Sequence, residues 1–382
     1  MGSPDTAFIC RKARQASCRP RIGRLGPRSV YVRPLGILWG RLAETAVAEG
    51  VAKPLVGRGA YTSCQVILRW DTHYHIGHMT VEALDLWRSR QSAALIDKLG
   101  ELLTNISSVR QSQLADRERD PSIVGILNLT PDSFSDGGKF INNKLADKQV
   151  NKLLDDGAKI VDLGGESTRP GAKEIDPQEE WKRIKSKLNN LSKRKCIISL
   201  DTRKSFIIKK SLPYKVSLIN DVSGLSYDKD TIEILKKSKI PFVIHHMQGT
   251  PKTMQIKPNY INVLLDIYDF FEEKLKLIRK KNIKHNNIIL DPGIGFGKNL
   301  KHNITLISKI SIFHSLGFPI MLGLSRKKFI KDLAGINDSK ERIGGTISSC
   351  IYSSLQGIQI LRVHDVNEVN QALKVFKKLQ LH

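Results

Sequence analysis

The sequence after residue 120 predicts an α/β fold, a barrel of eight parallel strands that alternate with helices. Eight apolar runs recur between residues 121 and 382, each short enough for one buried strand, and segments with helical spacing separate them. Eight strand–helix units in about 260 residues match the count and size of a (β/α)₈, or TIM, barrel. An open, doubly wound parallel sheet is the alternative that the same alternation allows.

The expected strands, in chain order, are "SIVGILNL", "KIVDLGG", "KCIISLD", "VSLIND", "PFVIHHM", "NNIILDPG", "PIMLGLS" and "IQILRVHD". Between them, apolar residues spaced by three or four positions predict amphipathic helices. One such helix is indicated by the stripe Leu264, Ile267, Phe271, Leu275 and Ile278. The last helix carries Val366, Val369, Leu373 and Phe376. Asp365 and Glu368 are spaced like a capping box at its start.

The composition changes near Asp120, where an Arg-, Ala- and Gly-rich part gives way to one rich in Lys, Ile and Asn. We expect residues 1–120 to form a poorly ordered N-terminal extension of unknown role and residues 121–382 to form the barrel. Residues 1–80 show no periodicity, whereas residues 81–118 have the composition for one or two helices. A role in targeting or plain disorder are the alternatives for this extension.

Two targeting signals are weak. An Arg-rich start makes residues 1–35 similar to a transit peptide, which would place the protein in an organelle, but prolines at positions 4, 20, 27 and 34 oppose the amphipathic helix of such peptides. "MGSPDT" fits the myristoylation pattern, which often matches by chance. Five cysteines without CxxC spacing indicate reduced thiols. We therefore expect a cytoplasmic protein.

A net charge of +25 raises the question of a nucleic acid or a membrane surface as partner. Most lysines lie on predicted helices, as in "EEWKRIKSKLNNLSKRK", where a solvated face explains them. Aromatic residues make up only 6% of the chain, which disfavours an RNA-binding protein, the rival of a different class. No apolar run approaches the ~20 residues of a membrane span. The charge also suits an anionic small substrate, so we expect no nucleic acid and no membrane as partner.

Polar residues follow every predicted strand, at the barrel end that carries the active site in this fold. They are, strand by strand, Asn128; "GGESTRPG"; Asp201-Thr202-Arg203; Asn220-Asp221; His245-His246-Met247-Gln248; Asp291 with "PGIGFGK"; Ser325-Arg326-Lys327; and Arg362-Val363-His364-Asp365. Taken singly, Asp201 is explained as a helix cap and Asn220-Asp221 as a turn. "GIGFGK" lacks the Walker spacing, and adjacent histidines face opposite sides of a strand, which disfavours a two-His metal site.

Eight such endings in one ring call for a ligand, because buried ionisable groups without partners are costly. Asp201 and Asp291 are acceptors for the amino and N–H edge of a ring, Asn220 both donates and accepts, and Lys327 suits a carbonyl oxygen. Arg362 and His364, beside Asn128, suit a diphosphate with Mg²⁺ as companion. The ring therefore predicts one site for a polar, anionic, heterocyclic ligand.

These motifs, in this order, closely resemble the dihydropteroate synthase family. The matching pieces are "GILNLTPDSFSDGG", "DLGGESTRPGA", "SLDTRKS", "LINDVSG", "HHMQGTPKTMQ", "ILDPGIGFGKN", "LGLSRKKFI" and "RVHDV". They run from residue 123 to about residue 380, and residues 1 to about 115 have no counterpart. A methyltransferase barrel that uses methyltetrahydrofolate and a corrinoid protein shares the pterin-holding residues, but its methyl donor has no diphosphate. The "STRPG", "LSRK" and "RVHD" motifs therefore favour the synthase.

The resemblance implies a transferase of folate biosynthesis, in which (7,8-dihydropterin-6-yl)methyl diphosphate and 4-aminobenzoate give 7,8-dihydropteroate and diphosphate. It implies that Asp201, Asn220, Asp291 and Lys327 hold the pterin, that Asn128 helps to bind Mg²⁺, and that Arg362 and His364 bind the diphosphate. Asp201, Lys327, Arg362 and His364 would be the catalytic residues. Thr168 and Arg169, with the loop 130–138, would form the aminobenzoate pocket, where sulfonamides compete. A homodimer, formed through the last helices, is also implied.

Overall fold

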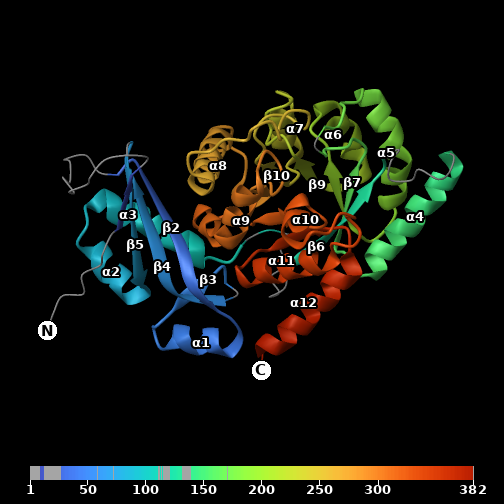
Figure 1. Ribbon diagram of the computed structural model, residues 1–382. Coiled ribbons are helices and arrows are strands. Elements are labelled where there is room, and N and C mark those ends of the chain that lie inside the picture. The colour runs from blue at the N-terminus through green and yellow to red at the C-terminus, as the bar shows by residue number, and fades with distance from the viewer. Residues whose placement is uncertain are drawn as a thin grey trace.

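The computed structural model describes residues 9–12, 27–57, 59–71, 73–110, 112, 114, 121–130, 139–169 and 171–381. Eight parallel strands form a nearly closed barrel in the order β11-β10-β9-β8-β7-β6-β13-β12. A parallel bridge between Leu290 and Ile320 links the two ends of this path. The predicted TIM barrel is confirmed, and Figure 1 shows its helices around the strands.

The barrel strands are β6 (Ser122–Asn128), β7 (Ile160–Gly164), β8 (Ile197–Asp201), β9 (Val216–Asp221), β10 (Phe242–His245), β11 (Ile288–Asp291), β12 (Met321–Gly323) and β13 (Ile360–Val363). The helices are α4 (Lys139–Asp155), α5 (Pro177–Leu191), α6 (Ser205–Ser211), α7 (Thr231–Ser238), α8 (Val263–Lys280), α9 (Leu300–Ser308), α10 (Lys328–Ala334), α11 (Ile343–Leu355) and α12 (Val366–Leu381). Short 3₁₀ turns are η2 (Leu212–Tyr214), η3 (His285–Asn287) and η4 (Ile310–Leu316).

Helix α8 forms where the sequence predicts it. The Asn262 side chain caps its first turn by accepting from the amides of Leu264 and Leu265. The predicted stripe Leu264, Ile267, Phe271, Leu275 and Ile278 is buried against the strands. Helix α12 begins differently from the expected capping box, because the Asp365 carboxylate pairs with Arg326 and accepts from its Nε at 3.0 Å.

Residues 9–12 and 29–107 differ from the expected poorly ordered extension. They form an antiparallel sheet of β1 (Ile9–Lys12), β5 (His73–Thr80), β4 (Gly59–Arg69) and β2 (Ser29–Leu38), with β3 (Lys53–Leu55) beside β4. The accompanying helices are α1 (Gly40–Ala48), α2 (Val81–Ser89) and α3 (Ala93–Ser107). Because β2 begins at Ser29, residues 29–35 of the transit-peptide alternative belong to this folded sheet.

The central parts of β2 and β4 are buried on both faces, which explains why no alternation marks them in the sequence. Val30 and Val32 of β2 pack with Leu99 and Leu102 of α3 on one face. Tyr31, between the two valines, belongs to the barrel's own apolar cluster. Figure 1 shows the sheet between α2 and the barrel, whereas α3 reaches the barrel itself, where Asn105 donates to the carbonyl of Ser315 in η4.

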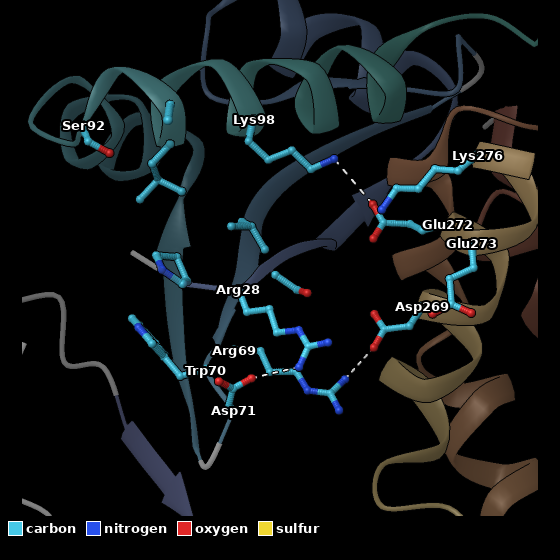
Figure 2. A pocket seen from close by; sticks show the side chains of 15 residues that line it. Arg28, Arg69, Trp70, Asp71, Ser92, Lys98, Asp269, Glu272, Glu273 and Lys276 are labelled. Atoms are coloured by element: carbon cyan, nitrogen blue, oxygen red, sulfur yellow. Dashed lines mark hydrogen bonds and ion pairs between the residues drawn. The ribbon is translucent and has the colours of Figure 1, made fainter. Parts of the chain in front are cut away.

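Polar contacts join this N-terminal unit to the barrel. The Tyr31 hydroxyl donates to Asp269 Oδ1 at 2.7 Å, and Arg69 Nη1 donates to Asp269 Oδ2 at 2.7 Å. Figure 2 shows Arg69 facing Asp269, and Lys98 facing Glu272, across a cavity of about 560 Å³. Charged side chains on the two sides of this cavity form ion pairs across it, and these pairs hold the N-terminal unit against the barrel.

Leu114 closes the barrel at the end opposite the polar loops. It is 2% exposed and packs in a cluster with one residue from each of seven strands. These residues are Val124, Ile160, Leu218, Val243, Ile289, Met321 and Ile360.

Within the described ranges, no helix has the length and apolar character that a membrane crossing needs.

Candidate active site at the carboxyl ends of the barrel strands

Arg362, from the end of β13, bridges two carboxylates across the barrel mouth. Its Nε donates to Asp162 Oδ2 at 2.6 Å, and its Nη2 donates to Asp201 Oδ2 at 2.8 Å. Asp162 also accepts from Asn220 Nδ2 at 3.3 Å and from the hydroxyl of Ser199. The predicted residues Asp201, Asn220 and Arg362 are therefore brought into one network. Asp162 joins them, although the sequence did not single it out.

Two acceptor atoms in this network have no partner among the described residues, Asp201 Oδ1 and Asn220 Oδ1. Asp201 and Asn220 are direct neighbours in the β8–β9 register, and they are 5% and 3% exposed. Buried polar atoms are almost always hydrogen-bonded, and leaving one unpaired costs about 1–3 kcal/mol. The pair therefore points to a ligand that brings hydrogen-bond donors.

Burial dominates the electrostatics of Asp201. It raises the pKa of this carboxyl to about 8, against the attraction of Arg362, and the nearby Asp162 acts in the same direction as burial. A donor-rich ligand would relieve this penalty, because hydrogen bonds to a carboxylate favour its charged form. The site is therefore prepared for an N–H-bearing partner.

Lys327 and Asp291 line the opposite side of the mouth. Burial lowers the pKa of Lys327 to about 8, although the Asp291 carboxylate acts the other way. The Lys327 ammonium donates to the carbonyl of Ile294 and lies 4.7 Å from the Phe296 ring centroid. Gly295, at φ +83°, makes room for it, since a Cβ there would stand 3.2 Å from Lys327 Cδ. A cation and an aromatic face thus border the same space.

His364 stands beside Ser325, with 3.1 Å between its Nδ1 and the Ser325 hydroxyl. Burial first, then the neighbouring Arg362, lowers the pKa of His364 to about 3. This imidazole is neutral at pH 7, so it can offer a hydrogen bond but no charge to an anion.

Asn128 ends β6 next to Gly164, and its Oδ1 lies 3.5 Å from where a Cβ on Gly164 would stand. Gly164 in turn neighbours Asp201 in the β7–β8 register.

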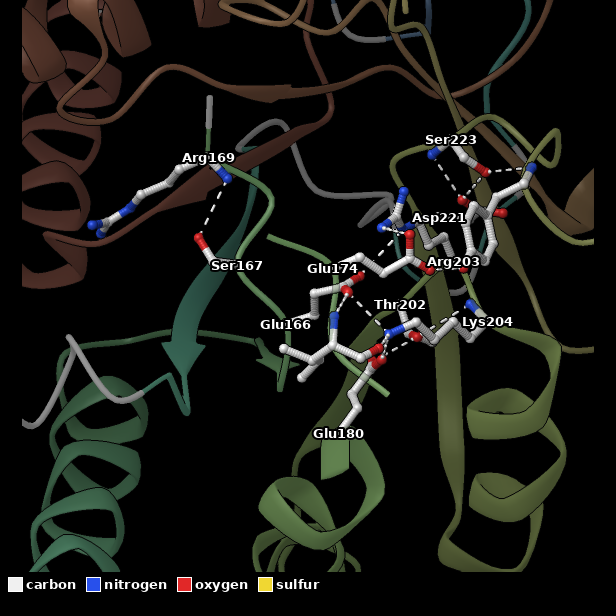
Figure 3. A network of polar contacts seen from close by, with 12 residues as sticks. Glu166, Ser167, Arg169, Glu174, Glu180, Thr202, Arg203, Lys204, Asp221 and Ser223 are labelled. Atoms are coloured by element: carbon white, nitrogen blue, oxygen red, sulfur yellow. Dashed lines mark hydrogen bonds and ion pairs between the residues drawn. The ribbon is translucent and has the colours of Figure 1, made fainter. Parts of the chain in front are cut away.

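Thr168 is half-buried and Arg169 exposed, on the loop between β7 and α5. The Arg169 charge contributes to lowering the pKa of His364, so this loop faces the β13 side of the mouth. Figure 3 shows Arg169 extending away from the ion network at the loop's base. In the predicted loop 130–138, residues 131–138 lie outside the described residues.

His245 and His246 have separate surroundings. The His245 Nδ1 lies 3.1 Å from the carbonyl of Val222, and the His246 Nδ1 lies 3.0 Å from the Lys298 ammonium. In the part of the chain that the structure describes, no three His, Cys, Asp or Glu side chains gather closely enough to hold a metal ion alone. A metal here would need oxygen atoms from a ligand or from water.

Sequence reasoning missed Asp162 and the buried network of Glu166, Glu180 and Lys204. A usable signal existed for Asp162, because an aspartate in the middle of the apolar run "KIVDLGG" must find partners in the interior. Glu180 had no such signal. It lies in the hydrophilic helix segment "PQEEWKR", where a solvated position is expected, yet it is fully buried.

Comparison with known proteins adds an independent line of evidence. The family described as "Pterin binding enzyme" matches residues 124–364. The dihydropteroate synthase of Escherichia coli strain K12 is 40% identical over 258 residues, covering 67% of this chain and 90% of that protein. The crystal structure of Yersinia pestis dihydropteroate synthase with a sulfonamide drug complex is 38% identical, with a TM-score of 0.65, and covers 69% of this chain and 95% of its own.

The Xanthomonas albilineans dihydropteroate synthase with 4-aminobenzoic acid is 32% identical, has a TM-score of 0.65, and covers 69% of this chain and 94% of its own. The family match begins at residue 124, so the N-terminal sheet and helices lie outside it. The similarity therefore concerns the barrel and the polar groups at its mouth.

Proposed function

The chain belongs to the dihydropteroate synthases, a family of pterin-binding enzymes, and on this premise we propose which of its residues hold each substrate. It is a transferase of folate biosynthesis, which joins (7,8-dihydropterin-6-yl)methyl diphosphate to 4-aminobenzoate. The C–N bond of 7,8-dihydropteroate forms, the C–O bond to diphosphate breaks, and the amine loses a proton.

The pterin lies between Asp201 with Asn220 on one side and Asp291 with Lys327 on the other. The observation that carries this proposal is the pair of unpartnered oxygens, Asp201 Oδ1 and Asn220 Oδ1, on neighbouring strands. A pterin edge offers adjacent amino and ring N–H donors, which match two adjacent acceptors. Its ring carbonyl oxygen suits the Lys327 ammonium, and Phe296 supplies an aromatic face.

The diphosphate lies between Arg362 and His364. Arg362 uses Nε and Nη2 for Asp162 and Asp201, which leaves Nη1 directed to neither carboxylate among the described contacts. His364 acts as a neutral hydrogen-bond donor, because its pKa is about 3. Together with the two residues that bind the pterin most directly, they form the catalytic set. We propose that this set, which contacts the reacting pterin diphosphate, is Asp201, Lys327, Arg362 and His364.

Mg²⁺ fits this arrangement. Asn128 offers one amide oxygen at the mouth, and Mg²⁺ typically takes one or two protein oxygens and completes its shell with phosphate and water. When bound, the ion neutralises the charge of the departing diphosphate. Isothermal titration should show tighter pterin diphosphate binding with Mg²⁺, and Asn128→Ala should remove most of that gain.

Thr168 and Arg169 form the aminobenzoate pocket together with the loop 130–138. The loop that carries Thr168 and Arg169 closes over an occupied diphosphate site, so pterin diphosphate binds first and 4-aminobenzoate second. Closure excludes water from the cation-like pterin methylene that forms when the C–O bond breaks early. Sulfonamides, which mimic the arylamine, then compete with 4-aminobenzoate.

The N-terminal unit supports the barrel and takes no part in the chemistry. Its contacts reach α8, η4 and α11, whereas every residue assigned to substrate lies at the mouth.

We propose a cytoplasmic homodimer. Cys64, Cys196 and Cys350 are free thiols, as expected for a reducing compartment. Val375 and Leu379 of α12, 57% and 71% exposed, offer an apolar surface for the partner.

The function is tested by incubating the protein with pterin diphosphate, 4-aminobenzoate and Mg²⁺ and detecting dihydropteroate by mass spectrometry. Product should form only when both substrates are present. Diphosphate release without dihydropteroate would contradict the proposal.

The dimer is tested by sedimentation, in which Leu379→Lys should shift the protein to the monomer mass. An unchanged mass would remove α12 from the interface.

A further inference from the structure

A buried ion network lies at the base of the loop that carries Thr168 and Arg169 (Figure 3). Its four charged members, Glu166, Glu180, Arg203 and Lys204, are at most 7% exposed. None of them is assigned to a substrate above. Two acids and two bases balance in charge, and they come from the end of β7, the start of α5 and the residues after β8.

Lys204 ties the two ends of the loop together. Its ammonium donates to Glu166 Oε1 at 2.9 Å and to the carbonyl of Ile175 at 2.6 Å. Glu166 Oε1 also accepts from the Ile175 amide at 3.0 Å. The chain therefore leaves this network after Glu166 and returns to it at Ile175, and the Lys204 ammonium contacts both residues.

The base of the loop is anchored to the body of the barrel as well. Lys204 reaches Glu180 Oε2 at 2.8 Å, and Thr202, next to Asp201, donates to Glu180 Oε1 at 2.7 Å. Gly165 presses against α5, because a Cβ there would stand 2.7 Å from Ile184 Cγ2. The root of the loop is thus rigid, while Arg169 at its tip is exposed.

Stability alone does not account for this network. Buried ion pairs pay a large desolvation cost, and well-packed apolar residues of similar volume are often as stable or more stable. What the ions provide is a defined position for the loop, since charge-assisted hydrogen bonds fix direction as well as distance.

We propose that Lys204 and Glu166 are positioning residues that place Thr168 and Arg169 and thereby set the affinity for 4-aminobenzoate. This inference rests on the proposed function of the loop. Among the described contacts, neither residue hydrogen-bonds to a side chain assigned to the pterin, and the hydroxyl of Thr202, next to Asp201, donates to Glu180.

The test compares Glu166→Gln and Lys204→Met with Lys187→Met. Lys187 is a matched control, since it is 1% exposed on α5 and paired with Asp147 at 2.7 Å, away from the loop. Loss of one charge-assisted bond should raise KM for 4-aminobenzoate about tenfold or more. KM for pterin diphosphate should change by less than about twofold. Lys187→Met should leave both values unchanged.

A second readout does not depend on activity. Hydrogen exchange of amides in residues 167–174 should accelerate in Glu166→Gln and not in Lys187→Met. If Lys204→Met fails to fold, Glu166→Gln decides, because it keeps the Lys204–Glu180 pair. Equal rises in both KM values, or unchanged loop exchange, would overturn the positioning role. A wild-type protein that makes no dihydropteroate would instead refute the proposed function, and the exchange data would still decide whether the network holds the loop.

Discussion

Burial disfavours the charged form of the Asp201 carboxylate, and the fold provides a hydrogen-bond donor for only one of its two oxygens. Arg362 satisfies Oδ2, while Oδ1 has no partner among the described residues. Such an incomplete hydrogen-bond set is costly in the free protein. The cost is recovered when a donor arrives, so it adds to selectivity for a ligand with N–H groups at that place.

Replacing Asp201 or Lys327 by Ala should weaken pterin diphosphate binding while the fold survives. Loss of one charged hydrogen bond to a buried ligand costs about 1.5–3 kcal/mol, which corresponds to about 10–150-fold in affinity. Arg362 keeps Asp162 as a partner in Asp201→Ala, so the melting temperature should stay close to that of the wild type. Titration calorimetry measures the effect, with exposed Asp332→Ala as the control. Wild-type affinity in both site variants would refute the assignment.

The same two residues predict the pH dependence of kcat/KM for pterin diphosphate, which reports ionisations of the free enzyme. Asp201, with a pKa of about 8, must lose its proton to accept two hydrogen bonds, so the rate rises as pH approaches 8. Lys327, with a pKa of about 8, must keep its proton, so the rate falls above pH 8. We expect a narrow maximum near this pH.

Two variants separate the limbs of this profile. Asp201→Asn cannot titrate and should flatten the acid limb, whereas Lys327→Arg stays charged and should flatten the alkaline limb. A profile that both variants leave unchanged would assign the ionisations to other groups.

At the scale of elements, the barrel depends on a residue from outside its own strands. Leu114 fills the end of the barrel that the seven strand residues of its cluster leave open. A parallel barrel is a packed core and tolerates no void at either end. The linker to the N-terminal unit is therefore part of the barrel's packing.

Leu114→Ala should lower the free energy of unfolding by about 2–5 kcal/mol, the range for a buried Leu that leaves a cavity. Both KM values should stay at wild-type level, because the site lies at the opposite end. Urea unfolding and steady-state kinetics check this, with exposed Leu42→Ala as the control. A changed KM with an unchanged free energy of unfolding would mean that packing at Leu114 affects the substrate site at the other end of the barrel.

At the scale of the whole molecule, the N-terminal unit and the barrel share a core. Tyr31 and Ile67 pack in the barrel's apolar cluster, and the ring of Tyr31 meets that of Tyr268 edge-on at 5.0 Å. This differs from the expectation that residues 1–120 form a poorly ordered extension. The two units are therefore expected to unfold together rather than in separate steps.

A protein that begins at Arg117 should keep the KM values of the full chain and lose stability. It retains every residue assigned to substrate, but it exposes the side of Tyr268 that Tyr31 covers and lacks Leu114 at the end of the barrel. Thermal melting should show a lower midpoint than that of the full chain. A truncated protein that folds but makes no dihydropteroate would show that the N-terminal unit supplies part of the site.

The barrel and most of the candidate site follow from local patterns in the sequence. Each barrel strand is one continuous apolar run that ends in polar residues, so Asp201, Asn220, Asp291 and Arg362 could be placed at one mouth from local pattern alone. Parallel strands bring such endings together whatever the details of packing. The α8 stripe was predictable for the same reason, since periodicity is a local property.

The remaining features are visible only in the folded protein, because they depend on contacts between distant segments. The central parts of β2 and β4 have both faces covered, which removes the alternation that marks a strand. Glu180 looks solvated in its helix, and only the approach of Lys204 explains its burial. Leu114 becomes a plug, and Asp201 becomes costly to ionise, only once the barrel has closed around them. Burial and partner choice are properties of the assembled fold, and no local pattern encodes them.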